Sequence, residues 1–207
     1  MVATPLTAAM VMAALEATAS KTKPRDEDPF RKGDLVVYPT HGVGRIDRMG
    51  FEEIAGHRLN LIHVSFEDHQ MTLRIPVAQA RAAGLRKLTS PKALAEALTG
   101  LQGRPQASRL IWAKRSQEYL AKINTGNPNA LAEVLRDLQS APDGSGSSFS
   151  QRNLFEIALD RLAGEVAAVN GIRKPDAIAQ LNRTLADARA DCATERQRAD
   201  LAVRSEN

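Results

Sequence analysis

The sequence predicts an α+β protein in which a small β domain is followed by an all-helical domain. In residues 30–76, short runs of β-branched and aliphatic side chains are separated by Gly, Pro, Asn and Asp turn signals. Beyond residue 76 the apolar positions follow a helical period, and prolines and glycines mark the expected helix ends. The chain has 207 residues, 43% of them hydrophobic, which suits one domain or two small ones. No alternation of strands with helices supports a doubly wound sheet.

The β domain is expected to contain four short strands, at residues 35–38, 43–49, 59–66 and 71–76. In the last of these, alternation places Met71, Leu73 and Ile75 on one face and Arg74 on the other. The short link at 67–69 makes the last two strands a hairpin. Strands this short and this close together indicate a small, strongly bent sheet or barrel.

The helical domain follows, with helices expected at 77–83, 91–100, 108–124, 128–140, 151–169 and 175–203. Ser90 before Pro91, and Asn127 before Pro128, are typical of an N-cap residue followed by proline at the first helical position. Glycine stands at three of the expected helix ends, namely Gly100, Gly126 and Gly171.

Four parts of the chain are predicted. They are a flexible N-terminal extension over 1–29, the β domain over 30–88, the helical domain over 89–186 and a helical or flexible tail over 187–207. The apolar start of the chain is followed, not preceded, by positive charge and contains Glu16, which argues against a signal peptide. The sequence contains no uninterrupted apolar run of about 18 residues, so no membrane span is predicted. The single cysteine excludes an internal disulfide and fits the reducing cytoplasm.

The sequence contains little that resembles a known catalytic or cofactor-binding motif. Gly42 and Gly44 lie in a strand turn, without the Lys-Ser pair or the helix that a phosphate-binding loop requires. A metal site from His63, Asp68 and His69 is conceivable across the hairpin, but ordinary strand and turn residues explain them as well. We therefore expect no catalysis, no metal and no other cofactor.

Positive charge is concentrated in one segment. The whole chain carries a net charge of +4, and residues 104–122 alone carry an excess of the same size. The charged residues of this segment are Arg104, Arg109, Lys114, Arg115 and Lys122, against Glu118. A focused basic patch indicates a polyanionic partner, whereas a diffuse excess would indicate only solubility.

The only tryptophan, Trp112, lies among these cations. On a helix its stripe continues through Ser116, Tyr119, Leu120 and Ile123, while the cations occupy a different arc. One interpretation is that the ring is core and the basic arc is a solvated face. The other is that an apolar ring at a helix start, flanked by cations, is a minor-groove wedge with phosphate anchors beside it.

Three segments together resemble the CarD/CdnL family of bacterial transcription regulators. They are FRKGDLVVYPTHGVGRI at 30–46, which is an SH3-like or Tudor-like beginning, MTLRIP at 71–76, and RLIWAKRSQEYLAKINTGNPNALAEVLRDL at 109–138. The transcription-repair coupling factor shares the first domain, but this sequence carries no helicase motifs. The resemblance covers about residues 30–186.

The resemblance implies that the Tudor-like domain docks on the RNA polymerase β subunit through an exposed strand edge. Thr72, Leu73 and Arg74 are then the polymerase-binding residues. The sequence without the resemblance favours a solvated Arg74, and the resemblance reverses that preference.

The resemblance also implies that the helical domain binds promoter DNA at the upstream edge of the bubble, with Trp112 as the wedge. The basic residues implied to contact DNA are Arg109, Lys114, Arg115, Lys122 and Arg152. Ala113 and Gln117 stand where the family often has a small hydroxyl residue and a cation, so part of the phosphate anchoring is expected to be weaker. Arg152 either compensates or is an ordinary surface arginine.

The prediction is therefore a non-enzymatic transcription regulator, nucleoid-associated through RNA polymerase and without a membrane partner. It binds the polymerase β subunit and promoter DNA and stabilises the open promoter complex. The alternative is a protein-interaction adaptor that buries Trp112 and does not bind DNA. A metal-dependent enzyme ranks third.

Overall fold

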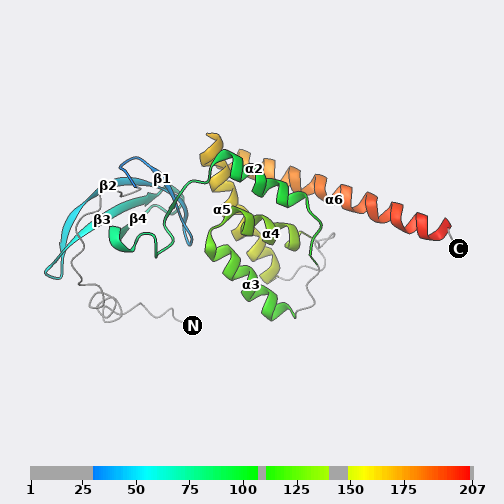
Figure 1. Cartoon of the computed structure of the whole chain (residues 1–207), viewed down its shortest axis with the longest axis horizontal. Coiled ribbons are helices and arrows are strands. Elements are labelled where there is room, and N and C mark those ends of the chain that lie inside the picture. Colours follow the sequence, from blue (N-terminus) through cyan, green and yellow to red (C-terminus); the bar gives the residue numbers. More distant parts are fainter. Residues whose placement is uncertain (1–29, 107–110, 140–148, 206–207) are drawn as a thin grey trace.

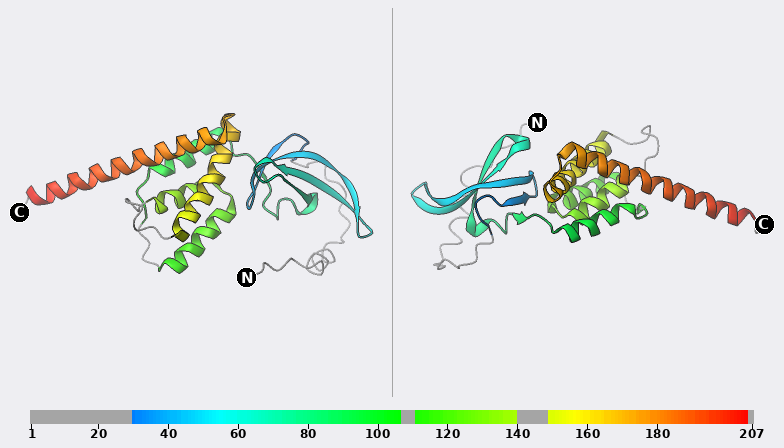
Figure 2. Two further views of the ribbon diagram at one scale, coloured as in Figure 1. Left: turned by 180° about the vertical axis from the view of Figure 1, so that it is seen from behind. Right: turned by 90° about the horizontal axis from the view of Figure 1, so that it is seen from above.

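A computed structural model of the chain describes residues 30–106, 111–139 and 149–205. Figure 1 shows the sheet and the helical domain side by side, with the last helix continuing past the other helices. The views in Figure 2 agree on this arrangement. The predicted α+β class, with a β domain preceding an all-helical one, is confirmed.

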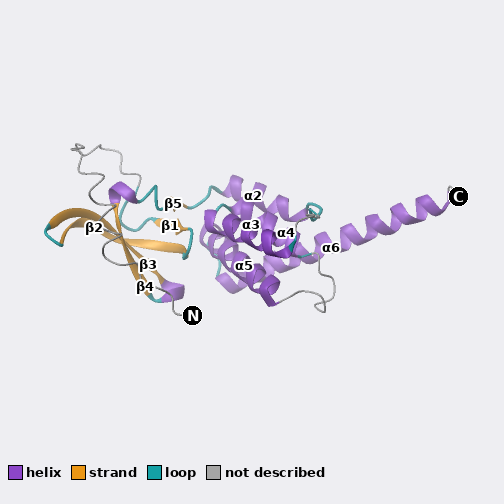
Figure 3. Ribbon diagram, turned by 90° about the horizontal axis from the view of Figure 1, so that it is seen from below, coloured by secondary structure: helices purple, strands orange, loops and turns teal. Residues whose placement is uncertain are grey.

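The sheet consists of β1 (Leu35–Tyr38), β2 (Gly42–Ile54), β3 (His57–Phe66), β4 (Met71–Pro76) and β5 (Arg86–Lys87). Their order is β4-β3-β2-β1-β5, and every neighbouring pair is antiparallel. Strands β4 and β5 are therefore the two edges of the sheet (Figure 3). The β2–β3 hairpin turns at Ala55 and Gly56, whose φ values of 51° and 79° suit the tight two-residue turn that the strand twist favours.

One face of the sheet carries the core of the β domain. Its buried residues are Phe30, Val36, Ile46, Ile62, Val64, Phe66, Ile75, Ala80 and Leu85. The register of β2 against β3 shifts between Ile46 and Arg48, and this bulge keeps both Ile46 and Met49 in contact with the core. A Cβ on Gly44 would lie 2.7 Å from Val64 Cγ1 and 2.8 Å from Phe66 Cε1, so the close packing there requires glycine.

The helix predicted over 77–83 is wrong. The segment forms a short 3-10 turn, η2 (Val77–Gln79), then further turns, and then the unpredicted strand β5. Gly84 has a φ of 83°, which reverses the chain where a helix would have continued. The Leu85 N–H donates to the Ala80 carbonyl, and the returning chain pairs with β1.

The helices are α2 (Pro91–Thr99), α3 (Trp112–Thr125), α4 (Pro128–Leu138), α5 (Phe149–Asn170) and α6 (Lys174–Ser205). Both predicted N-caps are confirmed, because the side chain of Ser90 accepts from the Ala93 N–H and that of Asn127 from the Asn129 N–H. Gly100 does not end the helical path, since a 3-10 turn, η3 (Gly100–Gln102), continues from it.

The third helix begins later than the predicted residue 108. Ile111 is extended, with φ −61° and ψ 151°, so the first helical residue is Trp112. Residues 107–110, including Arg109, lie outside the described residues. Gly126, with φ 63°, ends the helix as predicted.

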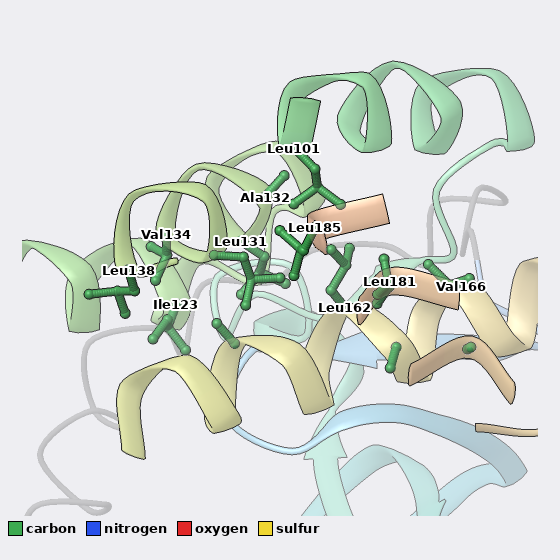
Figure 4. Packing of buried hydrophobic residues seen from close by; sticks show 14 of the residues in the cluster. Leu101, Ile123, Leu131, Ala132, Val134, Leu138, Leu162, Val166, Leu181 and Leu185 are labelled. Carbon is green, nitrogen blue, oxygen red and sulfur yellow. The ribbon is translucent and has the colours of Figure 1, made fainter. Parts of the chain in front are cut away.

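The helical domain has its own core, centred on leucines from α4, α5 and α6 (Figure 4). Leu131, Leu135, Leu162, Leu181 and Leu185 are each at most 1% exposed. Because this cluster and the sheet cluster are separate, the two halves of the chain do not share one core. The predicted limits 30–88 and 89–186 stay predictions, and the extension 1–29 lies outside the described residues. Among the described helices, none has the length and apolar character needed to cross a membrane.

Candidate functional site

The edge strand β4 carries the three residues predicted to bind a partner. Thr72 and Arg74 are exposed, and they face Ser65 and His63 across the β3–β4 ladder. The alternation predicted for this strand is confirmed, because Ile75 is buried on the opposite face. Among the described residues, no strand pairs with the other long side of β4, which makes it an edge of the kind that can take up a further strand.

Leu73 differs from its two neighbours, because its side chain is partly buried against the core of the β domain. It pairs with Val64 across the ladder, which is fully buried. Any contact that Leu73 makes with a partner therefore involves its backbone more than its side chain.

Arg74 belongs to a charged cluster on the face of the sheet opposite the core of the β domain, where Arg74 is exposed and His63 is buried. Glu52 lies at its centre, with Oε1 2.6 Å from Arg48 Nη2 and 3.0 Å from His63 Nε2. Arg74 Nη1 is 3.7 Å from Glu52 Oε2, and the Arg74 side chain is 62% exposed. An ion pair this long and this exposed holds the guanidinium weakly, so Arg74 can exchange Glu52 for an external partner.

The sequence reading missed Glu52 because it ended the second strand at residue 49. The observed strand continues to Ile54. The extra residues form the outer half of the β2–β3 hairpin. Glu52 comes close to Arg74 only because β2 is this long, and no local sequence motif predicts that length.

Trp112 occupies the first position of α3, at the end of that helix farthest from the sheet (Figure 1). The opposite end approaches the β domain, because a Cβ on Gly126 would lie 3.3 Å from Pro39 Cα. The ring is partly buried against the helical core, and its centroid is 6.5 Å from that of Tyr119. Burial is the main cause that raises the pKa of Tyr119 above its usual value, and Asp137 adds to it. Trp112 is therefore only partly buried, which matches neither extreme of the two interpretations.

The cations predicted around Trp112 have different environments. The guanidinium carbon of Arg115 lies 5.5 Å from the Trp112 ring centroid, within the range of a cation–π contact. Lys122 Nζ is 2.8 Å from a carboxylate oxygen of Glu133 on α4. Lys114 is exposed. Arg152, in the first turn of α5, is exposed as well.

Exposed apolar side chains before and within α3, and at the start of α5, were not anticipated. Ile111, the residue before the helix, is 68% exposed, and Leu120 is 44% exposed although the predicted stripe included it. Leu120 lies at the margin of that stripe, and only Tyr119 and Ile123 reach the core fully. Phe149, at the start of α5, is 81% exposed. No sequence signal distinguishes these residues from core positions, because their exposure depends on which helices pack nearby.

The candidate metal ligands are engaged elsewhere or lie outside the description. His63 faces Glu52, and Asp68 accepts a hydrogen bond from Lys174 at 2.6 Å. The side chain of His69 is outside the described residues. Within the described part of the chain, no three His, Cys, Asp or Glu side chains form a group that could hold a metal ion.

Comparisons with known proteins match both halves of the chain. Residues 30–89 match the family model described as the CarD-like/TRCF RID domain. Residues 96–182 match the model described as the CarD C-terminal domain. The first match contains β4, and the second contains Trp112 and all of α3.

Two relatives illustrate these matches. The putative transcription factor YdeB of Bacillus subtilis (strain 168) is 27% identical over 143 residues, which are 69% of this chain and 94% of that protein. The solution NMR structure of the 72-residue N-terminal domain of Myxococcus xanthus CarD is 33% identical. It covers 28% of this chain and 77% of that one, with a TM-score of 0.25.

Proposed function

This chain belongs to the CarD-like family of transcription factors, and from that premise we propose how it regulates transcription. Its β domain binds the RNA polymerase β subunit, and its helical domain contacts promoter DNA at the edge of the melted region. The combined contacts stabilise the open promoter complex. This places the chain on the nucleoid, with no catalytic step, cofactor or membrane involved.

The observation that carries the proposal is the position of β4, an exposed edge strand inside the segment that matches the RID domain. Strand addition to this edge gives main-chain hydrogen bonds to the partner, and alternate side chains give specificity. Thr72 and Arg74 point to the solvent face, where an acidic partner surface could replace Glu52 as the neighbour of Arg74. Complementary charge of this kind sets partner choice and association rate more than raw affinity.

Support for the DNA contact comes from the start of α3. Trp112 is only partly buried, and the exposed Ile111 immediately precedes it in the chain. The N-cap residue, Ile111, gives no side-chain hydrogen bond to the first turn of the helix, although its carbonyl accepts from the Lys114 N–H. The N–H groups of Trp112 and Ala113 are therefore the ones proposed to meet a phosphate, and the exposed Lys114 adds a positive charge. An apolar wedge at an unstacked base step opposes reclosing of the duplex, an effect of a few kcal/mol per step.

The adaptor that does not bind DNA remains a second candidate, because Trp112 does pack against Tyr119 and Lys122 is already paired with Glu133. Intrinsic fluorescence discriminates the two functions, since the chain has a single tryptophan. Under the DNA-binding proposal, forked DNA changes the emission of Trp112 in the full-length protein. An adaptor shows the same spectrum with and without DNA.

The polymerase contact is tested by Arg74→Glu in the full-length chain, with the purified polymerase β subunit in a pull-down. We expect binding to fall by at least about tenfold, because charge reversal introduces repulsion in the interface. Arg81→Glu, a charge reversal at another exposed arginine, in the turns after η2, is the matched control and should bind normally. Equal binding by the two variants would contradict the assignment of β4.

A further inference from the structure

A short connection and a set of polar contacts join the two domains. Only residues 88–90 separate β5 from α2, so the sheet cannot move far from the helices. The turn before β2 and the start of β2 pack on α5, where a Cβ on Gly164 would lie 3.8 Å from Val43 Cγ2. Figure 2 shows the sheet against the end of the helical domain in both views.

Glu165 is the most buried part of this junction. It lies on α5, is 1% exposed, and accepts hydrogen bonds on both oxygens from the Arg86 guanidinium, each at 2.7 Å. The backbone N–H of Thr89 donates to the same carboxylate at 2.9 Å. Arg86 also donates to the Gly126 carbonyl at the end of α3. A bidentate pair of this kind fixes direction as well as distance, because both planar groups must align.

Arg161, one helical turn before Glu165 on α5, makes the second connection. Its guanidinium donates to the backbone carbonyls of Pro39 and Thr40 in the β1–β2 turn. Burial lowers the pKa of Arg161 below its usual value, although nearby Asp160 opposes that shift.

Lys174, the first residue of α6, makes the third connection. Its ammonium group lies 2.6 Å from Asp68 in the β3–β4 turn and 2.7 Å from Asp160 on α5. Desolvation opposes the shift, but the hydrogen bonds to Asp160 and Asp68 raise the pKa of Lys174 above its usual value. The three connections reach three different parts of the sheet, namely β5, the β1–β2 turn and the β3–β4 turn, and together they restrict rotation about any axis.

We propose that Arg86, Glu165, Arg161 and Lys174 form an interdomain brace that holds β4 and the start of α3 in one fixed orientation, so that the chain works as a rigid bridge. This inference rests on the proposed function, because it concerns how the two partner surfaces cooperate. When two sites on one molecule bind at once, the gain depends on their geometry and disappears if the geometry prevents simultaneous contact. A rigid bridge gains more binding free energy than a flexible tether that makes the same contacts, because less conformational entropy is lost when both partners are bound.

Glu165→Gln tests the brace with little change in volume. An amide has one acceptor oxygen, so at least one of the donors from Arg86 or Thr89 then faces an NH₂ group. Three quantities are measured with the full-length chain: affinity for polymerase, affinity for forked DNA, and the lifetime of open promoter complexes. We expect both affinities to stay within about twofold while the lengthening of the complex lifetime falls by about tenfold or more. Asp176→Asn, which breaks the exposed ion pair between Arg173, just before α6, and Asp176 in its first turn, is the matched control and should change none of the three.

A disulfide across the same junction distinguishes lost orientation from lost stability. Val43→Cys with Gly164→Cys, in a Cys192→Ser background, places two thiols where a Cβ on Gly164 would lie 3.8 Å from Val43 Cγ2, and formation of the disulfide is verified before use. Added to Glu165→Gln, the oxidised form should recover the open-complex lifetime, and the reduced form should not. Failure of the verified disulfide to restore the lifetime would overturn the inference.

The outcomes for the wild type and for Glu165→Gln distinguish failure of the proposed function from failure of the rigid bridge. A wild-type chain that binds neither polymerase nor forked DNA would overturn the proposed function and the inference with it. A wild type that binds both, with an unchanged complex lifetime in Glu165→Gln, would overturn the rigid bridge and leave the proposed function intact.

Discussion

Trp112→Ala separates a wedge from a core residue, because the ring already makes measurable contacts in the free protein. An aromatic pair such as Trp112 with Tyr119 contributes about 0.5 to 1.5 kcal/mol. The Arg115 contact adds about 0.5 to 1 kcal/mol. Truncating a fully buried tryptophan to alanine typically costs about 3 to 5 kcal/mol in total, ring contacts included, and the partly buried ring of Trp112 should cost roughly half of that total. We therefore expect the free energy of unfolding to fall by about 2 kcal/mol.

Two measurements on one preparation check this expectation. Far-UV circular dichroism follows unfolding, since the substitution removes the only tryptophan and with it the fluorescence signal. The lifetime of open promoter complexes is measured at a temperature where the variant is folded, and it should fall by about tenfold, which corresponds to about 1.4 kcal/mol of lost wedge contact. Recruitment to polymerase should remain normal, because the ring lies far from β4.

Trp112→Phe serves as the matched control. A phenyl ring retains an aromatic contact with Tyr119, so most of the lost stability should return, while the shorter side chain restores little of the complex lifetime. If Trp112→Ala loses far more than about 2 kcal/mol and leaves the complex lifetime unchanged, the residue is structural and the wedge is wrong.

Two further predictions concern charge. DNA binding by the full-length chain should weaken as the salt concentration rises. Lys114→Ala should flatten the slope of log binding constant against log salt concentration by about one unit, because it removes one exposed cation proposed to contact a phosphate. An unchanged slope would show that Lys114 is only solvated. Asp34→Asn should lower stability at neutral pH by less than about 1 kcal/mol. Desolvation acts in the opposite direction, but the hydrogen bonds from Lys87 and from the Arg31 N–H hold the pKa of Asp34 below its usual value. A carboxyl whose pKa is lower in the folded state stabilises the fold at pH values above its pKa in the unfolded chain. That stabilisation is lost as the pH falls through its pKa in the folded protein. Urea titrations of the variant and the wild type should therefore converge in acid and differ at neutral pH.

Local signals predicted the elements that depend on local chemistry. Ser90 and Asn127 mark helix starts because their side chains cap the next backbone N–H groups, whatever packs outside. The exposure of Arg74 followed from strand alternation, since Ile75 had to face a core. These features need no knowledge of the other domain.

The features that sequence reasoning missed depend on the other domain or on distant strands. Strand β5 has two residues, Arg86 and Lys87, and becomes a strand only because β1 lies beside it. Glu165 looks like a surface residue of an amphipathic helix, yet it is among the most buried side chains, because Arg86 comes from 79 positions away. Leu120 was assigned to the core stripe and is exposed, because no described helix covers that margin of α3.

The structure also changes how much of the affinity for DNA comes from phosphate contacts. Of the cations predicted to bind DNA within the described residues, Arg115 stacks on Trp112 and Lys122 pairs with Glu133, which leaves Lys114 and Arg152 exposed. Each engaged cation must give up its present contact before it neutralises a phosphate, so its net contribution is smaller. Weak binding to DNA alone is then the expected state of this protein, and attachment to polymerase must supply the local concentration that makes the contact effective. A rigid brace at Glu165 keeps the helical domain oriented toward DNA once the β domain is bound to polymerase. Fewer phosphate contacts are then needed to hold the DNA.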